Sequence, residues 1–287
     1  VLSKGKVDLL FVEAAVNDLA NKTPAAQQQK AMEGIIRHAL TANPYMNIIL
    51  MAFADEDKIR DYRNGKAPAE VALHDQLAKY YKLSFLNLAQ EVQQRIANKE
   101  FSWKDDFKDL HPSPFGQEIY FQTIKTLLKN VAGQYRNESL VKSILPAVQN
   151  KGYYGSGRYV SVDKATALKG FSVTPNWQPN DKAETRARFV HVPVLEANQP
   201  GASFSFTFTG NAAGIAIVAG PDAGMIKYSV DGKPDKVMDL YTQWSGGLHL
   251  PWYLVLADGL PKGKHILKVQ ITAQKNKDSK GNACRIV

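Results

Sequence analysis

The chain has 287 residues, 44% hydrophobic and 22% charged, which is the balance of an ordinary globular protein with about two domains. The formal net charge is +9, but lysine and arginine are spread along the chain, so the charge does not indicate a nucleic-acid partner. The single cysteine excludes an intrachain disulfide, and no apolar run approaches the roughly 20 residues that a membrane-spanning helix needs.

The first half of the sequence alternates between predicted strands and predicted helices. Nearly continuous apolar runs predict buried parallel strands at residues 7–16, 47–53 and 83–88. Apolar residues at helical spacing predict helices at residues 23–40, 68–81, 89–97 and 116–132, with a polar loop at 103–114. This alternation is typical of an α/β fold, so we expect a three-layer α/β/α domain around a parallel sheet.

The second half of the sequence consists of short β-rich runs separated by turn residues. Phe204, Phe206 and Phe208 alternate with Ser and Thr, which places the three rings on one face of a strand. The pattern predicts an antiparallel β-sandwich domain. We therefore expect domains at residues 1–148 and 149–287, joined by a glycine-rich junction at 152–157.

The two ends of the sequence look as if they lie inside a longer protein. The chain begins with Val-Leu-Ser instead of Met, and residues 284–287 have the composition of the middle of a strand. We therefore expect the first domain to be incomplete at its N-terminus, and the targeting signal is left open.

Asn17 and His111 carry the chemistry that we expect of the first domain. Asn17 follows the first predicted strand, where ligands of open α/β sheets bind, and its amide can donate a hydrogen bond to a developing oxyanion. His111 lies in the loop before the last predicted helix and can act as general base toward a serine, then as acid toward the leaving alcohol. Asp109 is close enough in sequence to hold the imidazole tautomer. Glu13, inside the predicted strand, would be buried and needs a partner.

The other histidines lack metal-ligand spacing, so we predict no metal or organic cofactor. His38 and His74 fall on predicted helices as surface or packing residues, and we expect His265 to be exposed on a strand. His249 lies in a predicted loop with Trp244 and Trp252 nearby, and these rings either stack on a sugar or pack in the core.

Two motifs resemble conserved blocks of the SGNH/GDSL-type hydrolases. Residues 12–18 (Val-Glu-Ala-Ala-Val-Asn-Asp) resemble the third block of that family, whose Asn contributes to the oxyanion hole. Residues 109–116 (Asp-Leu-His-Pro-Ser-Pro-Phe-Gly) resemble the fifth block, which carries the catalytic His and usually an Asp. The resemblance covers about residues 1–132 and implies a serine esterase with His111 as base and Asn17 as oxyanion donor.

The chain departs from the pattern of that family in two ways. The nucleophilic Ser and the oxyanion-hole Gly belong to blocks that precede the third, so we expect the serine upstream of Val1 and the 287-residue chain by itself to be inactive. The family commonly places Asp three residues before the His, where this chain has Lys108. Asp109 can serve instead, as can Asp105, Asp106 or a carbonyl oxygen.

The second domain also resembles part of such enzymes. Residues 219–224, 228–232 and 242–251 are similar to the β-sandwich domain appended to some bacterial SGNH esterases thought to act on carbohydrates. This implies removal of acetyl or similar esters from polysaccharide by a periplasmic or secreted enzyme. Two alternatives stay open: a non-catalytic carbohydrate-binding or surface protein with a degenerate hydrolase half, and a lipid acylhydrolase. The sequence does not predict the oligomeric state.

Overall fold

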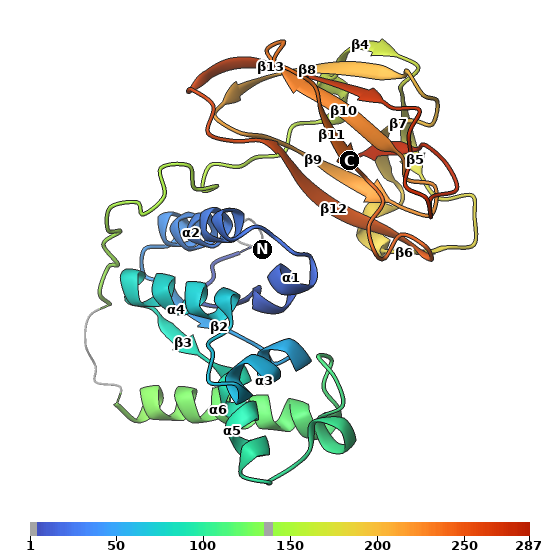
Figure 1. Ribbon diagram of the computed structural model, residues 1–287. Helices are drawn as coiled ribbons and strands as arrows, with labels where there is room; N and C mark the ends of the chain where they lie inside the picture. Colours follow the sequence, from blue (N-terminus) through green and yellow to red (C-terminus); the bar gives the residue numbers. More distant parts are fainter. Residues whose placement is uncertain (1–4, 135–139) are drawn as a thin grey trace. The chain divides into compact units, whose positions relative to one another are not determined.

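The structure is a computed structural model that describes residues 5–134 and 140–287 (Figure 1). The chain forms two compact units, Val1–Gly157 and Arg158–Val287, and each is described by itself. Residues 149–157, which the change in sequence texture groups with the second domain, fall in the first unit. No helix in the two described ranges is both long enough and apolar enough to cross a lipid bilayer.

A parallel sheet in the order β1-β2-β3 forms the centre of the first unit. β1 (Leu9–Glu13) runs alongside β2 (Asn47–Met51), and β2 pairs on its other side with β3 (Ser84–Leu86). Every residue of β2 except Asn47 is buried, as expected for a central strand covered on both faces. The three apolar runs of the sequence therefore predicted the parallel sheet correctly.

Helices cover both faces of this sheet and give three layers (Figure 1). The α-helices are α1 (Ala15–Ala20), α2 (Ala25–Ala42), α3 (Glu56–Arg63), α4 (Ala69–Tyr81), α5 (Leu88–Ala97) and α6 (Pro114–Gln134). Ile48 and Leu50 of β2 pack against α2 and α4, whereas Ile49 and Met51 pack against α3, α5 and α6. Successive side chains of a strand point to opposite faces, so β2 contributes to a separate core on each side.

The first two elements differ from their prediction. β1 ends at Glu13 and α1 follows, so Asn17 lies on a helix and not at the end of a strand. The apolar run continues through both elements, and a helix of 6 residues is too short to display a helical period. The sequence pattern also misses α3, because charged residues dominate its sequence and leave no apolar stripe.

Residues 143–155 form a strap that packs on α2 and α4. The fully buried carboxylate of Glu33 accepts hydrogen bonds from the backbone N–H groups of Gln149 (2.8 Å) and Asn150 (2.9 Å). The same carboxylate accepts a hydrogen bond from the Tyr81 hydroxyl at 2.6 Å. A Cβ atom on Gly34 would lie 2.8 Å from the strap backbone, so glycine allows the strap to lie directly on α2.

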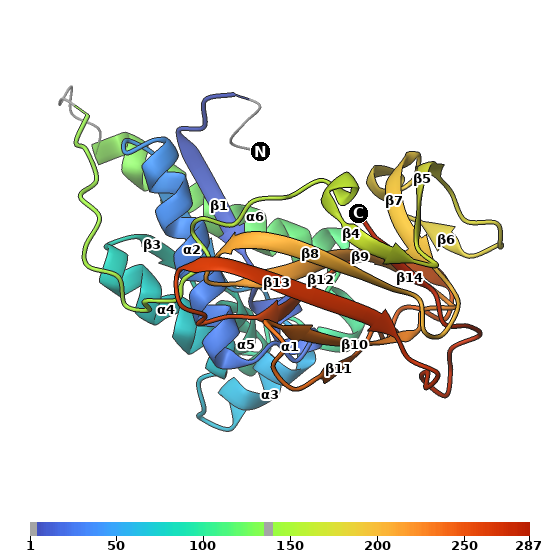
Figure 2. The ribbon, with the colours of Figure 1, turned by 90° about the horizontal axis from the view of Figure 1, so that it is seen from above.

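The second unit contains two sheets, with orders β11-β10-β13-β8-β4 and β5-β7-β14-β9-β12-β6 (Figure 2). Its strands are β4 (Thr166–Lys169), β5 (Ser172–Trp177), β6 (Glu184–Thr185), β7 (Val192–Ala197), β8 (Ser203–Gly210), β9 (Ala213–Ala219), β10 (Met225–Val230), β11 (Lys236–Asp239), β12 (Leu248–Ala257), β13 (Gly263–Ile271) and β14 (Cys284–Ile286), with short 3-10 helices at Val162–Lys164 and Ala187–Phe189. All of these strand pairs are antiparallel except β6–β12. Ile217 of one sheet and Leu267 of the other belong to one hydrophobic core. The predicted antiparallel architecture is confirmed.

Several polar side chains of the second unit are buried. His265 is 7% exposed, so the prediction that it is exposed was wrong; its Nδ1 lies 2.6 Å from Asp231. His249 lies on β12 instead of in a loop and contacts Asp181 at 3.0 Å. Cys284 is fully buried, and this burial raises the pKa of its thiol to about 12.

Candidate active site

His111 lies in a turn between a π-helical segment, η2 (Trp103–Phe107), and α6. Its side chain is 89% exposed. The backbone around it is held firmly, because the N–H of Lys108 donates to the carbonyl of Trp103 at 2.6 Å. The N–H of Ser113 donates to the carbonyl of Phe107 at 2.9 Å. The turn therefore presents an exposed imidazole on a fixed backbone.

Gly116 attaches this turn to the start of α6. A Cβ atom at Gly116 would lie 2.6 Å from the Cβ of Pro112 and 2.8 Å from the ring of Phe107, closer than real Cβ contacts allow. The side-chain amide of Gln117 donates to the Pro112 carbonyl at 3.0 Å. The residue that follows His111 is thus packed and hydrogen-bonded against the helix.

Asp109 contacts His111 through one carboxylate oxygen. That oxygen accepts a hydrogen bond from the backbone N–H of His111 at 2.5 Å and lies 3.8 Å from the ring Nδ1. The second distance suits an ion pair but is too long for a hydrogen bond. Asp109 therefore shapes the turn, and its role in orienting the imidazole stays a prediction.

The two other carboxylates near the turn are engaged at Ser102. Asp106 accepts a hydrogen bond from the Ser102 N–H at 2.8 Å, and Asp105 accepts one from the Ser102 hydroxyl at 3.1 Å. These bonds cap the start of η2, where the backbone N–H groups lack partners within the turn. Asp105 and Asp106 thus stabilise the start of η2, whereas Asp109 contacts His111.

Asn17 is exposed in α1, which follows β1 at the carboxyl edge of the sheet. Its carbonyl accepts a hydrogen bond from the Asn21 N–H at 2.9 Å, within the helix. Across the described residues, no hydrogen bond or ion pair joins Asn17 to His111 or Asp109. The structure brings Asp109 and His111 together, and the pairing of either with Asn17 stays a prediction.

A group of buried and half-buried charged side chains lies at the carboxyl edge of the sheet, and the sequence indicated only one of them, Glu13. Glu13 accepts hydrogen bonds from the N–H groups of Val16 (3.2 Å) and Phe53 (3.3 Å), which supplies the partner that it needs. Burial raises the pKa of Glu13, and those two hydrogen bonds oppose the rise. Lys58 is fully buried and forms an ion pair with Asp55, the N-cap of α3. The signal in the sequence was Asp55 as an N-cap residue followed by the acidic Glu56 and Asp57 of the first turn.

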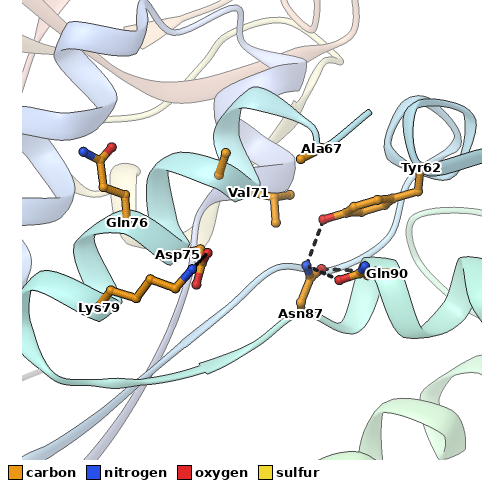
Figure 3. Close-up of a pocket in the computed structure, with 9 residues that line it drawn as sticks. Tyr62, Ala67, Val71, Asp75, Gln76, Lys79, Asn87 and Gln90 are labelled. Atoms are coloured by element: carbon orange, nitrogen blue, oxygen red, sulfur yellow. Dashed lines mark hydrogen bonds and ion pairs between the residues drawn. The ribbon is translucent and has the colours of Figure 1, made fainter. Parts of the chain in front are cut away.

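A pocket of about 410 Å³ opens between α3, α4 and α5 (Figure 3). Asn87, the residue after β3, donates to the Tyr62 hydroxyl at 2.8 Å and to the Gln90 side chain at 3.1 Å. Asp75 and Lys79 pair with each other on the α4 side of the pocket. The pocket thus combines an aromatic ring, the three side-chain amides of Gln76, Asn87 and Gln90, and an oppositely charged pair. Nothing in the sequence pattern indicated this pocket.

The sequence of the first unit is similar to a known protein family. Residues 1–119 match the family model of the GDSL-like lipase/acylhydrolase family. The matched residues make up most of the first unit, with its three-layer fold and its histidine turn before the last helix, so this unit is similar to the hydrolases of that family. This confirms the resemblance found in the two motifs.

The folds of the two units are also found, in the same order along the chain, in a solved structure. A two-domain esterase active on acetylated mannans matches 100% of this chain and 73% of its own chain, with a TM-score of 0.72 and 19% sequence identity. The same kind of esterase co-crystallised with mannopentaose gives a TM-score of 0.71 and covers 72% of that chain. Among curated proteins, none matches the chain. At this identity the match shows a shared fold: a parallel α/β domain followed by antiparallel sheets.

Proposed function

We propose that this protein is a serine esterase that removes acetyl groups from carbohydrate, with His111 as base and Asn17 as an oxyanion donor. The observation that carries the proposal is the His111 turn, which holds an exposed imidazole on a fixed backbone inside the part of the chain that matches the hydrolase family. A base must reach its proton in a defined geometry, and a fixed turn provides it without a mobile loop.

The proposed reaction proceeds through an acyl-enzyme. Nε2 of His111 takes the proton of a serine hydroxyl while that oxygen attacks the ester carbonyl, and the amide of Asn17 donates to the resulting oxyanion. The imidazolium returns the proton to the leaving sugar hydroxyl as the ester bond breaks. Water, activated by the same imidazole, then releases acetate and restores the serine. Asp109 orients the imidazole through its carboxylate.

The nucleophile of this scheme belongs to the first block of the family, and we propose that it lies upstream of Val1. Within the described residues, β1 pairs only with β2, so its other edge can accept a further parallel strand. Such a strand would end at the same carboxyl edge as β1, where Asn17 and the buried charges lie.

The pocket supports carbohydrate as the substrate class. Sugars bind through stacking on an aromatic ring and through hydrogen bonds from planar polar groups, and Tyr62, Asn87 and Gln90 supply both. Asn87 follows β3, and Asn17 lies in the helix that follows β1, two strands away at the same edge of the sheet. A polymer that presents its acetyl group near Asn17 could extend toward this pocket.

Hydrolysis of p-nitrophenyl acetate by the full-length protein tests the catalytic assignment. His111→Ala should lower kcat by about 10²–10⁴-fold, because the base is lost. His38→Ala, which removes a histidine from α2, is the matched control and should leave kcat unchanged. If His111→Ala keeps wild-type turnover, the assignment fails and the non-catalytic alternative is favoured.

Tyr62→Ala tests the substrate class. Loss of the ring should raise KM for acetylated mannan about tenfold, the equivalent of roughly 1.4 kcal/mol, and leave KM for p-nitrophenyl acetate unchanged. Tyr45→Ala removes an exposed tyrosine outside the pocket and serves as control. Rates that rise with acyl-chain length on lipid esters, without activity on acetylated mannan, would instead favour the lipid acylhydrolase.

A further inference from the structure

Helix α1, which carries Asn17, does not stabilise itself. It has only 6 residues, and its N-cap, Ala14, provides no side-chain hydrogen bond. Helices this short are unstable in isolation, because few backbone hydrogen bonds offset the cost of starting the helix. Its position at the carboxyl edge must therefore come from contacts with other elements.

Glu13 supplies the first of these contacts. Its carboxylate accepts a hydrogen bond from the N–H of Val16, in the first turn of α1, and so replaces the missing cap. The same oxygen accepts a hydrogen bond from the N–H of Phe53, just after β2. Glu13 therefore connects the start of α1 to the end of the neighbouring strand.

His74 of α4 supplies the second contact. Its ring is fully buried, and its Nε2 lies 3.8 Å from a carboxylate oxygen of Asp18, the residue after Asn17. Beside it, Val71 packs against Ala15 of α1 in a small apolar cluster. The imidazole thus lies between the body of α4 and the helix that carries the oxyanion donor.

A leucine has a similar size and would fill the space of the His74 ring, and its burial would not remove a polar group from water. Within the described residues, neither ring nitrogen of His74 has a hydrogen-bond partner. Burying an imidazole without hydrogen bonds destabilises the folded state, because the ring loses its hydrogen bonds to water. No three acidic, histidine or cysteine side chains in residues 5–134 and 140–287 are grouped to hold a metal ion, so metal binding does not explain His74. Its contact with Asp18 is the interaction that a leucine could not provide.

We propose that His74 is a positioning residue of the active site, which acts on Asp18 and, together with Glu13, fixes α1 so that Asn17 faces the developing oxyanion. This inference rests on the proposed function, in which Asn17 is an oxyanion donor. The direction of the hydrogen bond from the exposed Asn17 then depends on the half-buried Glu13 of β1 and the buried His74 of α4.

Steady-state kinetics of the full-length protein on p-nitrophenyl acetate test this role. His74→Leu should lower kcat about tenfold with KM unchanged, because an oxyanion donor acts in the transition state and not on the bound substrate. His74→Gln, which keeps a polar group that can reach Asp18, should recover part of the loss. His38→Leu on α2 is the matched control and should leave kcat unchanged.

A double mutant separates positioning from general destabilisation. Asn17→Ala by itself should cost about 10²–10³-fold in kcat, and adding His74→Leu should cost nothing more, because His74 acts through Asn17. Losses that multiply in the double mutant, or unchanged kcat in His74→Leu, would overturn the proposal.

Amide exchange in the 287-residue chain tests the structural part without any activity. The N–H groups of Asp18 and Asn21, bonded to Ala14 and Asn17, should exchange several-fold faster in His74→Leu while the amides of β2 keep their protection. Unchanged exchange in α1 overturns the positioning role even if the esterase assignment holds. Conversely, faster exchange with activity independent of His111 would refute only the proposed function. If His74→Leu does not fold, His74→Gln gives the same comparison.

Discussion

His111 combines an exposed side chain with a backbone that the following helix holds in place. Pro112 lies against Gly116 so closely that any side chain there would push it away. This packing does not cover the imidazole, which stays exposed. The position of His111, the proposed base, therefore depends on Gly116, which has no side chain that could take part in the reaction.

Substituting Gly116 tests this dependence. Gly116→Ala should destabilise the first unit by about 1–3 kcal/mol through overpacking and lower kcat, because Pro112 and Phe107 must move. Gly133→Ala, in the same helix and with nothing within 4 Å of its Cβ position, is the control and should be neutral or slightly stabilising. Chemical denaturation and p-nitrophenyl acetate turnover measure the two effects, and equal behaviour of both variants would contradict the packing argument.

The pair of His265 and Asp231 predicts how the stability of the second unit depends on pH. The Asp231 carboxylate and the Pro261 carbonyl raise the pKa of His265 above its usual 6.5, so this stabilisation is complete below about pH 6.5 and is lost as pH rises through the raised pKa. The pKa of Asp231 is lowered from 3.8 by His265 and by the Ile266 N–H, so its contribution is lost as pH falls through the lowered value. The pair stabilises most between about pH 4 and 6.5.

Unfolding of the second unit, measured from below about pH 4 to well above pH 6.5, checks the prediction. The wild-type midpoint should fall as pH rises above 6.5, and His265→Gln should remove that dependence. His191→Gln changes an exposed histidine whose Nδ1 contacts Asn176 and should keep the wild-type profile. A wild-type midpoint that is flat above pH 6.5 would show that the ion pair contributes no stability there.

At the site, the sequence predicts which residues carry chemistry but not which residues hold them in place. Asn17, Asp109 and His111 follow from the two motifs, and the turn contact between Asp109 and His111 is present. The contact of His74 with Asp18 links residues 56 positions apart, which no local pattern reports. His265 could have been predicted as buried, because it lies at alternate positions with Leu267 and Val269 and therefore on the same face of the strand as these two apolar residues.

Among the elements, long periodic segments were predicted well and short ones were not. β2 and α4 were predicted nearly in full, because an uninterrupted apolar run and a helical apolar stripe are strong signals. α1 was merged into the preceding strand, since Ala14 offers no cap signal and the apolar run does not break. Its existence depends on Glu13 and α4, which are tertiary contacts.

The hydrogen bonds between the strap and Glu33 of α2 lead to a prediction about what holds the strap in place. Glu33→Ala should leave the Tyr81 hydroxyl and two strap N–H groups without acceptors, a loss of about 2 kcal/mol or more. The strap should then detach, and trypsin should cleave after Lys151 faster than in wild type, as measured by mass spectrometry. Glu118→Ala, on the exposed part of α6, is the control. Equal cleavage in all three proteins would mean that Glu33 does not retain the strap.

At the scale of the whole molecule, the net charge of +9 allows a test of the kind of polymer bound. Binding of a neutral acetylated mannan through stacking and hydroxyl contacts should be insensitive to salt, with KM changing less than about twofold. KM for an acidic acetylated polymer such as pectin should rise about tenfold from low to high salt as the attraction is screened. If KM for the acidic polymer is as insensitive to salt as KM for the neutral mannan, the net charge does not contribute to association.

The burial of Cys284 opens a route to site-specific spectroscopy. It is the only cysteine in the chain, it lies in the core of the second unit, and its thiol stays protonated near neutral pH because burial raises its pKa to about 12. Maleimide reagents should therefore leave the native protein unlabelled. A cysteine introduced at the exposed Leu110 would take up a spin label or fluorophore alone, and its signal would report the motion of the histidine turn during turnover.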